Sequence, residues 1–169
     1  DPASLPPALN GVDIAFYLVH SMGSSGAYSD EDRRAAHNFG RAARDAGVSR
    51  VVYLGALGSG RALSHHLASR QETGAILGGY VPTVEFRAGI IIGSGSLSFA
   101  AINALVRRLP VMVTPRWVST RTQPIAIDDV VRYLVAATDA SVAPGVYEIG
   151  GPDVMTYEGL MLECARQQG

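Results

Sequence analysis

The residues most suggestive of chemistry in this chain lie in one apolar run, 87–95, which reads Arg-Ala-Gly-Ile-Ile-Ile-Gly-Ser-Gly. An apolar strand that ends in a Gly-x-Gly turn is typical of a buried parallel strand whose end lets a ligand approach the backbone. In open α/β sheets, ligands lie outside the carboxyl ends of the strands. The run therefore predicts ligand contacts at Gly89 and Gly93, with a tight turn that binds nothing as the alternative.

Two arginine positions extend this prediction. Arg87 lies inside the apolar run, where a charge must be paired or must face a ligand, and an ion pair with Glu85 is the competing interpretation. Further along the chain, Trp117 is flanked by Arg116 and Arg121, an arrangement that suits a lid over an anionic substrate group. A hydrophobic plug with solvated arginines is the alternative for this second set.

Composition excludes several classes of protein. The chain has 169 residues, of which 47% are hydrophobic and 17% charged, so it has room for one domain with a substantial core and is not disordered. No run approaches ~18 uninterrupted apolar residues, so no membrane association is predicted. The net charge is -1 and no basic stripe stands out, which argues against nucleic acid as a partner. The single Cys164 and the absence of zinc-like Cys/His spacing predict no disulfide and no metal, and we expect a cytoplasmic location.

The elements that must position these residues alternate between strands and helices. Helices are predicted between Ser29 and Gly47, over 64–77 and 99–109, from Asp128 to 137, and from Thr156 onward. Strands are predicted at 12–20, 50–55, 83–92, 123–127 and 145–150. This alternation predicts an α/β fold with a mostly parallel sheet and right-handed crossovers.

Five segments, in the right order and at the right spacing, resemble one known family. Segment 12–20 is similar to its fourth strand, and 35–53 to the following helix and fifth strand. Segment 87–95 resembles its Arg-Pro-Gly and Gly-Pro-Gly elements, and 123–131 its hydrophobic-Asp-Asp-Val element before a helix. Segment 146–151 is similar to the part that closes the substrate-binding region. The family is the extended and atypical short-chain dehydrogenase/reductases, which include nucleotide-sugar epimerases and NmrA-like proteins.

The resemblance implies an incomplete Rossmann-type three-layer fold, with residues 1–169 as a single partial NAD(P)-binding domain. It places segments 110–127 and 145–169 on the substrate side. The family's first strand and glycine-rich phosphate loop would precede Asp1, and no Gly-x-x-Gly-x-x-Gly follows a strand in this sequence. We therefore expect the chain to be the carboxyl-terminal part of a longer protein. The uncovered edge of strand 12–20 would favour pairing with another chain, for example in a homodimer.

The family's Tyr-x-x-x-Lys motif falls on His66-Leu-Ala-Ser-Arg70, which makes His66 and Arg70 the implied catalytic pair. Residues four apart lie on one helix face. A histidine exchanges protons near neutral pH, whereas an arginine supplies charge and hydrogen bonds. A solvent-exposed pair, His65 with His66, is the alternative. The family's serine or threonine at the end of the fifth strand falls at Gly55 or Ala56, neither of which has a hydroxyl.

The remaining implied contacts divide between cofactor and substrate. For NAD or NADP they are Val19, His20, Gly55, Ala56, Arg87 and Gly89; for a small-molecule substrate they are Gly93, Trp117 and Arg121. Two functions compete on this basis. One is an NAD(P)-dependent nucleotide-sugar epimerase-like or atypical oxidoreductase of the short-chain dehydrogenase/reductase class. The other is a non-catalytic, NmrA-like dinucleotide-sensing regulator, which the replaced motif and the missing hydroxyl support.

Overall fold

The computed structural model describes residues 1–19, 28–58, 64–93, 96, 99–100, 102, 104 and 116–168. The chain divides into two compact units. Unit 1 comprises Asp1–Arg87 and Tyr133–Glu148, and unit 2 comprises Ala88–Arg132 and Ile149–Gly169. Most of the region expected on the substrate side belongs to unit 2.

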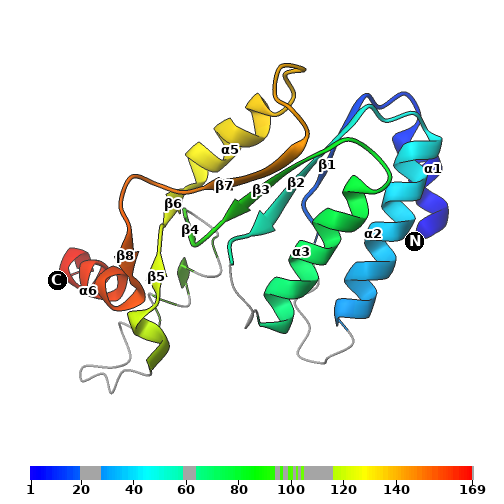
Figure 1. Cartoon of the computed structure of the whole chain (residues 1–169). Helices are drawn as coiled ribbons and strands as arrows, with labels where there is room; N and C mark the ends of the chain where they lie inside the picture. Colours follow the sequence, from blue (N-terminus) through cyan, green and yellow to red (C-terminus); the bar gives the residue numbers. More distant parts are fainter. Residues whose placement is uncertain are drawn as a thin grey trace. The chain divides into compact units, whose positions relative to one another are not determined.

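Unit 1 is built on a four-stranded sheet in the order β1-β2-β3-β7 (Figure 1). The strands are β1 (Ile14–Tyr17), β2 (Arg50–Ala56), β3 (Thr83–Ala88) and β7 (Gly145–Ile149). β1 and β2 pair in parallel, with Ile14 opposite Arg50 and Tyr17 opposite Tyr53. β1 is shorter than the predicted strand 12–20, because the pairing ends at Tyr17 and leaves Leu18 and Val19 beyond it.

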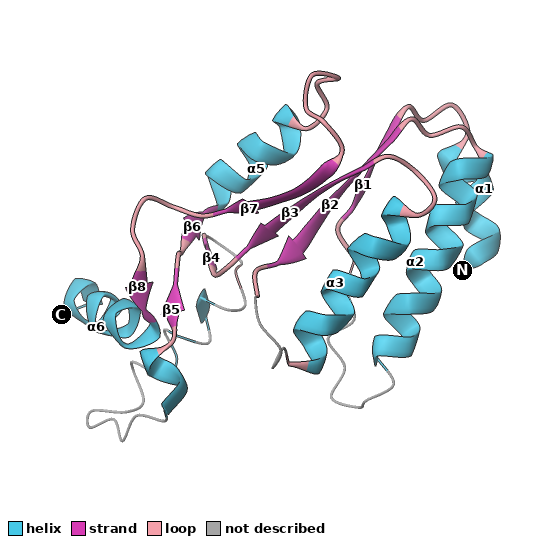
Figure 2. Ribbon diagram, in the orientation of Figure 1, coloured by secondary structure: helices cyan, strands magenta, loops and turns pink. Residues whose placement is uncertain are grey.

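Helices α2 (Tyr28–Asp45) and α3 (His65–Gly78) lie side by side against this sheet (Figure 2). A short 3-10 turn, Pro2–Ser4, and α1 (Leu5–Leu9) precede β1. Small residues on α2 bring the helix close to the sheet, and the shared core consists of Leu9, Ala15, Tyr17, Ala36, Ala43, Val48, Val51, Tyr53, Leu77 and Val81. This packing forms the first two layers of the unit.

The third layer comes from the carboxyl-terminal end of α5 (Ile127–Ala136). The rings of Phe86 and Tyr133 lie 5.7 Å apart, centroid to centroid. The preceding residue, Glu85, lies against α3, as expected because successive residues of a strand point to opposite faces of the sheet. The predicted three-layer α/β fold is confirmed.

Unit 2 is held together by short strand pairs and one helix. β4 (Ile91–Ile92) pairs in parallel with β6 (Ile125–Ala126), and β5 (Arg121–Thr122) pairs antiparallel with β8 (Met155–Thr156). A 3-10 turn, Arg116–Ser119, precedes β5, and α6 (Tyr157–Gln168) follows β8. The buried core consists of Ile90, Ile102, Leu160, Met161 and Cys164.

Several predicted boundaries differ from the structure. The predicted strand 83–92 is broken, because Ile90 accepts a backbone hydrogen bond from Ile125 at 2.9 Å and the chain joins a different sheet there. The helix expected to be capped by Asp128 begins one residue earlier, which puts this carboxylate in the first turn, where the helix dipole favours it. Thr156 does cap α6, since its Oγ1 accepts the Gly159 N–H at 3.1 Å. Of the predicted helix 99–109, residues 99, 100, 102 and 104 are helical, and the rest lie outside the described residues.

Candidate functional site

The carboxyl end of β2 is tied to α3 by hydrogen bonds from both elements. Arg70 donates from Nη2 to the Leu54 carbonyl, and the Tyr53 hydroxyl donates to the Arg70 carbonyl at 3.0 Å. The next residue of the helix, Gln71, donates from Nε2 to the Gly58 carbonyl at 2.8 Å. These bonds fix α3 beside the carboxyl end of β2, and ligands bind at the carboxyl ends of the strands in open α/β folds.

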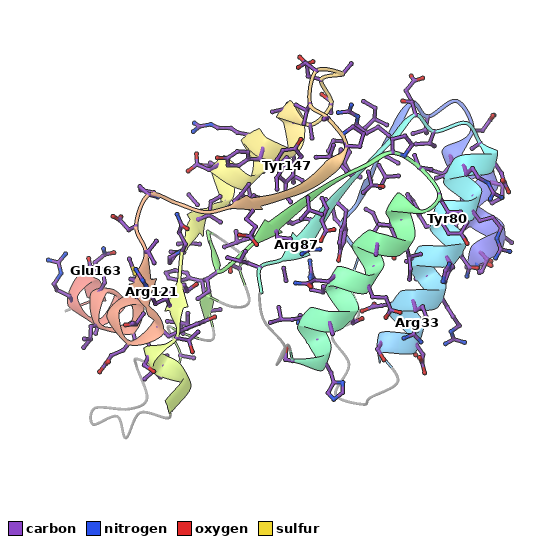
Figure 3. The ribbon with its side chains drawn as sticks, viewed as in Figure 1. Arg33, Tyr80, Arg87, Arg121, Tyr147 and Glu163 are labelled. Atoms are coloured by element: carbon purple, nitrogen blue, oxygen red, sulfur yellow. The ribbon has the colours of Figure 1, made fainter. Side chains whose placement is uncertain are left out.

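A buried carboxylate lies between β2 and α3. Glu85 is only 3% exposed, and its Oε1 accepts a hydrogen bond from Arg87 Nε at 2.7 Å (Figure 3). A Cβ atom added to Gly55 would lie 2.8 Å from Glu85 Oε1, and one added to Gly74 would overlap Oε2. The space that a side chain would take at either glycine is thus filled by the Glu85 carboxylate.

The phenol of Tyr53 completes this buried cluster. Its side chain is 1% exposed, and burial raises its pKa to about 12; Arg70 opposes the shift and Glu85 adds to it. The hydroxyl therefore stays protonated and donates its hydrogen bond throughout the physiological pH range. We refer to Tyr53, Arg70, Glu85 and Arg87 as the carboxyl-edge cluster. It combines two half-buried guanidinium groups with a buried carboxylate and a buried neutral phenol, so the two arginines are the members that can meet a charged ligand.

The two residues of the implied catalytic pair lie differently on α3. His66 is exposed in the first turn, whereas Arg70, one turn further, is half-buried and directed at β2. Arg70 Nε is buried and has no hydrogen-bond partner in the part of the chain that the structure describes. Such an orphaned donor is costly in a protein interior and calls for an explanation.

The implied cofactor contacts at the strand ends are placed as follows. Val19 lies beyond the end of β1 and is 66% exposed, and Ala56 is the half-buried last residue of β2. His20 lies outside the described residues. Arg87 forms the ion pair with Glu85 that was the competing interpretation of its charge.

At each glycine that was predicted to contact a ligand, a neighbouring residue takes the space that a side chain would need. At Gly55 the carboxylate of Glu85 fills the side-chain space, as described above. A Cβ at Gly89 would lie 3.3 Å from Thr122 Oγ1, and one at Gly93 would overlap the side chain of Ile127. The structure thus explains the missing side chains without a ligand, and ligand contacts at these positions stay a prediction.

The structure describes only part of the substrate residues that were predicted in unit 2. Arg121 is the exposed first residue of β5 (Figure 3), and the side chain of Trp117 lies outside the description. Unit 2 contains a cavity of about 290 Å³ whose apolar wall includes Phe99 and Leu160, and Arg121 is not among the described residues that line it. The sequence analysis missed this cavity, because its wall brings together residues that are far apart in the chain.

Glu85 is the central residue that the sequence analysis named only as a partner for Arg87. The sequence did contain a signal for the ion pair: Glu85 and Arg87 are two apart in a strand, so they share a face of the sheet and carry opposite charges. Among the described residues, no group of three or more His, Cys, Asp or Glu side chains is arranged to hold a metal ion. Within the same residues, no helix is long and apolar enough to cross a membrane.

The chain matches solved structures but no family model and no curated protein sequence. One match is a double mutant of DesIV, the dTDP-glucose 4,6-dehydratase from Streptomyces venezuelae, bound to NAD: 19% identity, TM-score 0.81, covering 100% of this chain and 61% of that one. Another is UDP-glucuronic acid 4-epimerase from Bacillus cereus in complex with NAD: 16% identity, TM-score 0.81, covering 100% and 64%. A third is MoeE5 in complex with UDP-glucose and NAD: 19% identity, TM-score 0.83, covering 100% and 67%.

These matches confirm the fold that the resemblance implies. The whole chain has the fold of part of NAD-bound nucleotide-sugar dehydratases and epimerases. It spans between 61% and 67% of the length of these three structures. At such sequence identities the likeness establishes the fold, and activity has to be argued from the site itself.

Proposed function

We propose that the protein is an NAD(P)-dependent oxidoreductase of the nucleotide-sugar epimerase or dehydratase type. The observation that carries this proposal is the carboxyl-edge cluster, which gathers charged groups and a neutral phenol at the ends of β2 and β3. Ligands bind at this edge in open α/β sheets. The fold match over the full length of the chain supports the same class.

The described residues suit one half of a dinucleotide. Ala56 at the end of β2 and Val19 beyond β1 offer an apolar surface for a nicotinamide ring, and the half-buried Arg70, bonded to the Leu54 carbonyl of β2, supplies a guanidinium. No described strand–turn–helix carries the glycine-rich sequence that binds a pyrophosphate. NAD(P), when bound, supplies hydride transfer.

The chain's own residues have separate tasks in this proposal. His66 exchanges a proton with the substrate at its imidazole. Arg70 remains charged and orients cofactor or substrate, held in place by the Leu54 carbonyl. On the substrate side, we assign contacts to Gly93, Trp117 and Arg121.

Turnover assays of a histidine variant test this assignment. Conversion of UDP-glucose and dTDP-glucose to an epimerised or dehydrated sugar product is followed with NAD or NADP present, because neither reaction changes the net amount of NAD(P)H, and His66→Ala is compared with His65→Ala. We expect His66→Ala to lower kcat by roughly 10²–10⁴ with little change in cofactor affinity, and His65→Ala to behave like the wild type. An active wild type with an unaffected His66→Ala variant would remove His66 from the mechanism. A wild type that turns over none of these combinations would contradict the proposed activity.

The alternative, a non-catalytic dinucleotide sensor, is favoured by one observation. A serine at position 55, where the family has its hydroxyl, would bring its Cβ within 2.8 Å of Glu85 Oε1. Tight binding of NAD(H) or NADP(H) in calorimetry without turnover would support this alternative. Binding together with turnover would support the oxidoreductase.

A further inference from the structure

The cavity in unit 2 has no role in the function proposed above. It is lined by residues of β4, β8 and α6 together with Phe99, and its volume is about 290 Å³. An engineered apolar cavity of about 150 Å³ is enough to bind benzene. The cavity in unit 2 is therefore large enough for a fused two-ring molecule.

Residues of the hydrophobic core of unit 2, and residues packed against that core, form the wall of this cavity. Leu160 and Cys164 are buried members of that core, and Ile92, Phe99 and Met155 are partly buried residues packed against it. All five line the cavity. An apolar ligand would remove their remaining exposed surface from water, which stabilises a complex by roughly 25 cal/mol per Å².

The polar groups at the cavity define the charge of its ligand. Glu163 lies on α6 and accepts hydrogen bonds from Arg166 at 2.7 and 2.9 Å and from Gln167 at 2.8 Å (Figure 3). These bonds hold the pKa of Glu163 at about 2, so its carboxylate is charged near neutral pH. Asp153 is exposed and takes part in no ion pair among the described residues. A carboxylate without a cation repels anions and accepts hydrogen bonds.

We propose that this cavity is a binding site for an uncharged, ring-containing molecule of about the size of indole that carries a hydrogen-bond donor. The ring lies against Phe99, Met155 and Leu160, and its N–H or O–H donates to the Asp153 carboxylate. Anionic molecules, including nucleotide phosphates, are disfavoured, because the described lining contains the carboxylates of Asp153 and Glu163 and no arginine, lysine or histidine. The site is therefore distinct in chemistry from one that receives a nucleotide sugar, and it does not depend on the proposed hydride transfer.

Cys164 provides a built-in reporter for this site. It is the chain's single cysteine, is 8% exposed and lines the cavity, so a bound ligand shields its thiol. Indole is used as the probe and the indole-3-carboxylate anion as its matched control, with binding followed by thermal shift and by the rate of thiol modification. We expect indole at ten times its Kd to slow modification about tenfold, in proportion to occupancy, and the anion to bind at least ten times more weakly.

Two tryptophan substitutions separate the cavity from general surface binding. Met155→Trp fills the cavity from its half-exposed side, whereas Leu162→Trp adds the same ring on the exposed face of α6, outside the lining. We expect indole binding and thiol protection to be lost in Met155→Trp and kept in Leu162→Trp. Equal binding of indole and its carboxylate to the wild type would overturn the proposal even if Met155→Trp does not fold. So would unchanged thiol modification in the wild type at saturating indole.

Discussion

The buried carboxylate of Glu85 restricts the residue types at neighbouring positions. A carboxylate that is 3% exposed needs a partner, and Arg87 on the same strand supplies the guanidinium. It also needs room, which two glycines on neighbouring elements provide. The pairing with Arg87 was predictable from the alternation of the strand. The contact with Gly74 was not, since it depends on how α3 is seated on the sheet.

Substitution of a helix glycine tests this close contact. In α3, Gly74→Ala places a methyl group into the Glu85 carboxylate, and such overpacking destabilises a protein by about 1–3 kcal/mol. Gly78→Ala in the same helix meets no atom within 4 Å and gains the helix propensity of alanine, up to about 1 kcal/mol. Urea denaturation of both variants measures the difference. A Gly74→Ala variant as stable as Gly78→Ala would show that the carboxylate is free to move away.

Tyr53 predicts a loss of stability at high pH. Its pKa rises from 10.0 to about 12 on folding, so above pH 10 the unfolded chain releases this proton before the folded protein does. The contribution is complete below pH 10 and is lost as the pH rises to about 12, by on the order of 2 kcal/mol. Denaturant titrations between pH 9 and pH 11.5 measure the slope, and Tyr53→Phe is expected to flatten it. A control that removes an exposed hydroxyl, Tyr147→Phe, should leave the slope unchanged; an equal effect of both would contradict the assignment.

At the scale of elements, the sequence predicts regular segments well and short ones poorly. Strand 50–55 and helix 64–77 agree with β2 and α3 to within a residue or so, because each carries a long apolar pattern between clear turn signals. β5 and β8 have two residues each, too few to show any periodicity. The break between β3 and β4 depends on pairing with β6, which lies more than thirty residues further along the chain.

One arginine joins the start of a strand to the end of a helix. Arg50 donates from Nη1 to the carbonyls of Ala137 at 2.7 Å and Asp139 at 2.8 Å, which follow α5 and have no partners within the helix. We expect Arg50→Met to lower the free energy of unfolding by about 1.5–3 kcal/mol, the range for hydrogen bonds to charged groups. Arg41→Met, on the exposed face of α2, should change it by less than about 0.5 kcal/mol. If the two substitutions lowered the free energy of unfolding equally in chemical denaturation, water would replace Arg50 at the Ala137 and Asp139 carbonyls without a loss of stability.

At the scale of the whole molecule, the fold could be predicted from the sequence but the arrangement of the candidate site could not. The α/β architecture follows from alternating patterns that extend along the entire chain. The carboxyl-edge cluster does not, since its members come from β2, β3 and α3 and meet only in the folded protein. The short family-like segments led to Arg70 and Arg87 as candidate site residues, and their roles stay a prediction. The hydrogen bond from Arg70 to Leu54 depends on how α3 packs on the sheet, whereas the pairing of Arg87 with Glu85 follows from the alternation of β3.

The open edge of the sheet predicts how the chain associates. β1 is the terminal strand in the order β1-β2-β3-β7, so no described strand pairs with its outer edge. Phe16, Leu18 and Val19 are 44%, 51% and 66% exposed, and residues 14–19 include no charged side chain that would disfavour pairing with another chain. We expect the 169-residue chain to form homodimers or larger species in light scattering at high concentration.

A lysine on that strand tests whether this edge is the interface. Phe16→Lys adds a charge that must be buried when two copies pair, so the scattering mass should fall toward the monomer value of 17.8 kDa. Leu162→Lys places the same charge on the exposed face of α6, and we expect it to leave the association unchanged. A wild-type chain that is a stable monomer at 17.8 kDa would refute the edge-strand argument, and equal dissociation by both lysines would place the interface elsewhere.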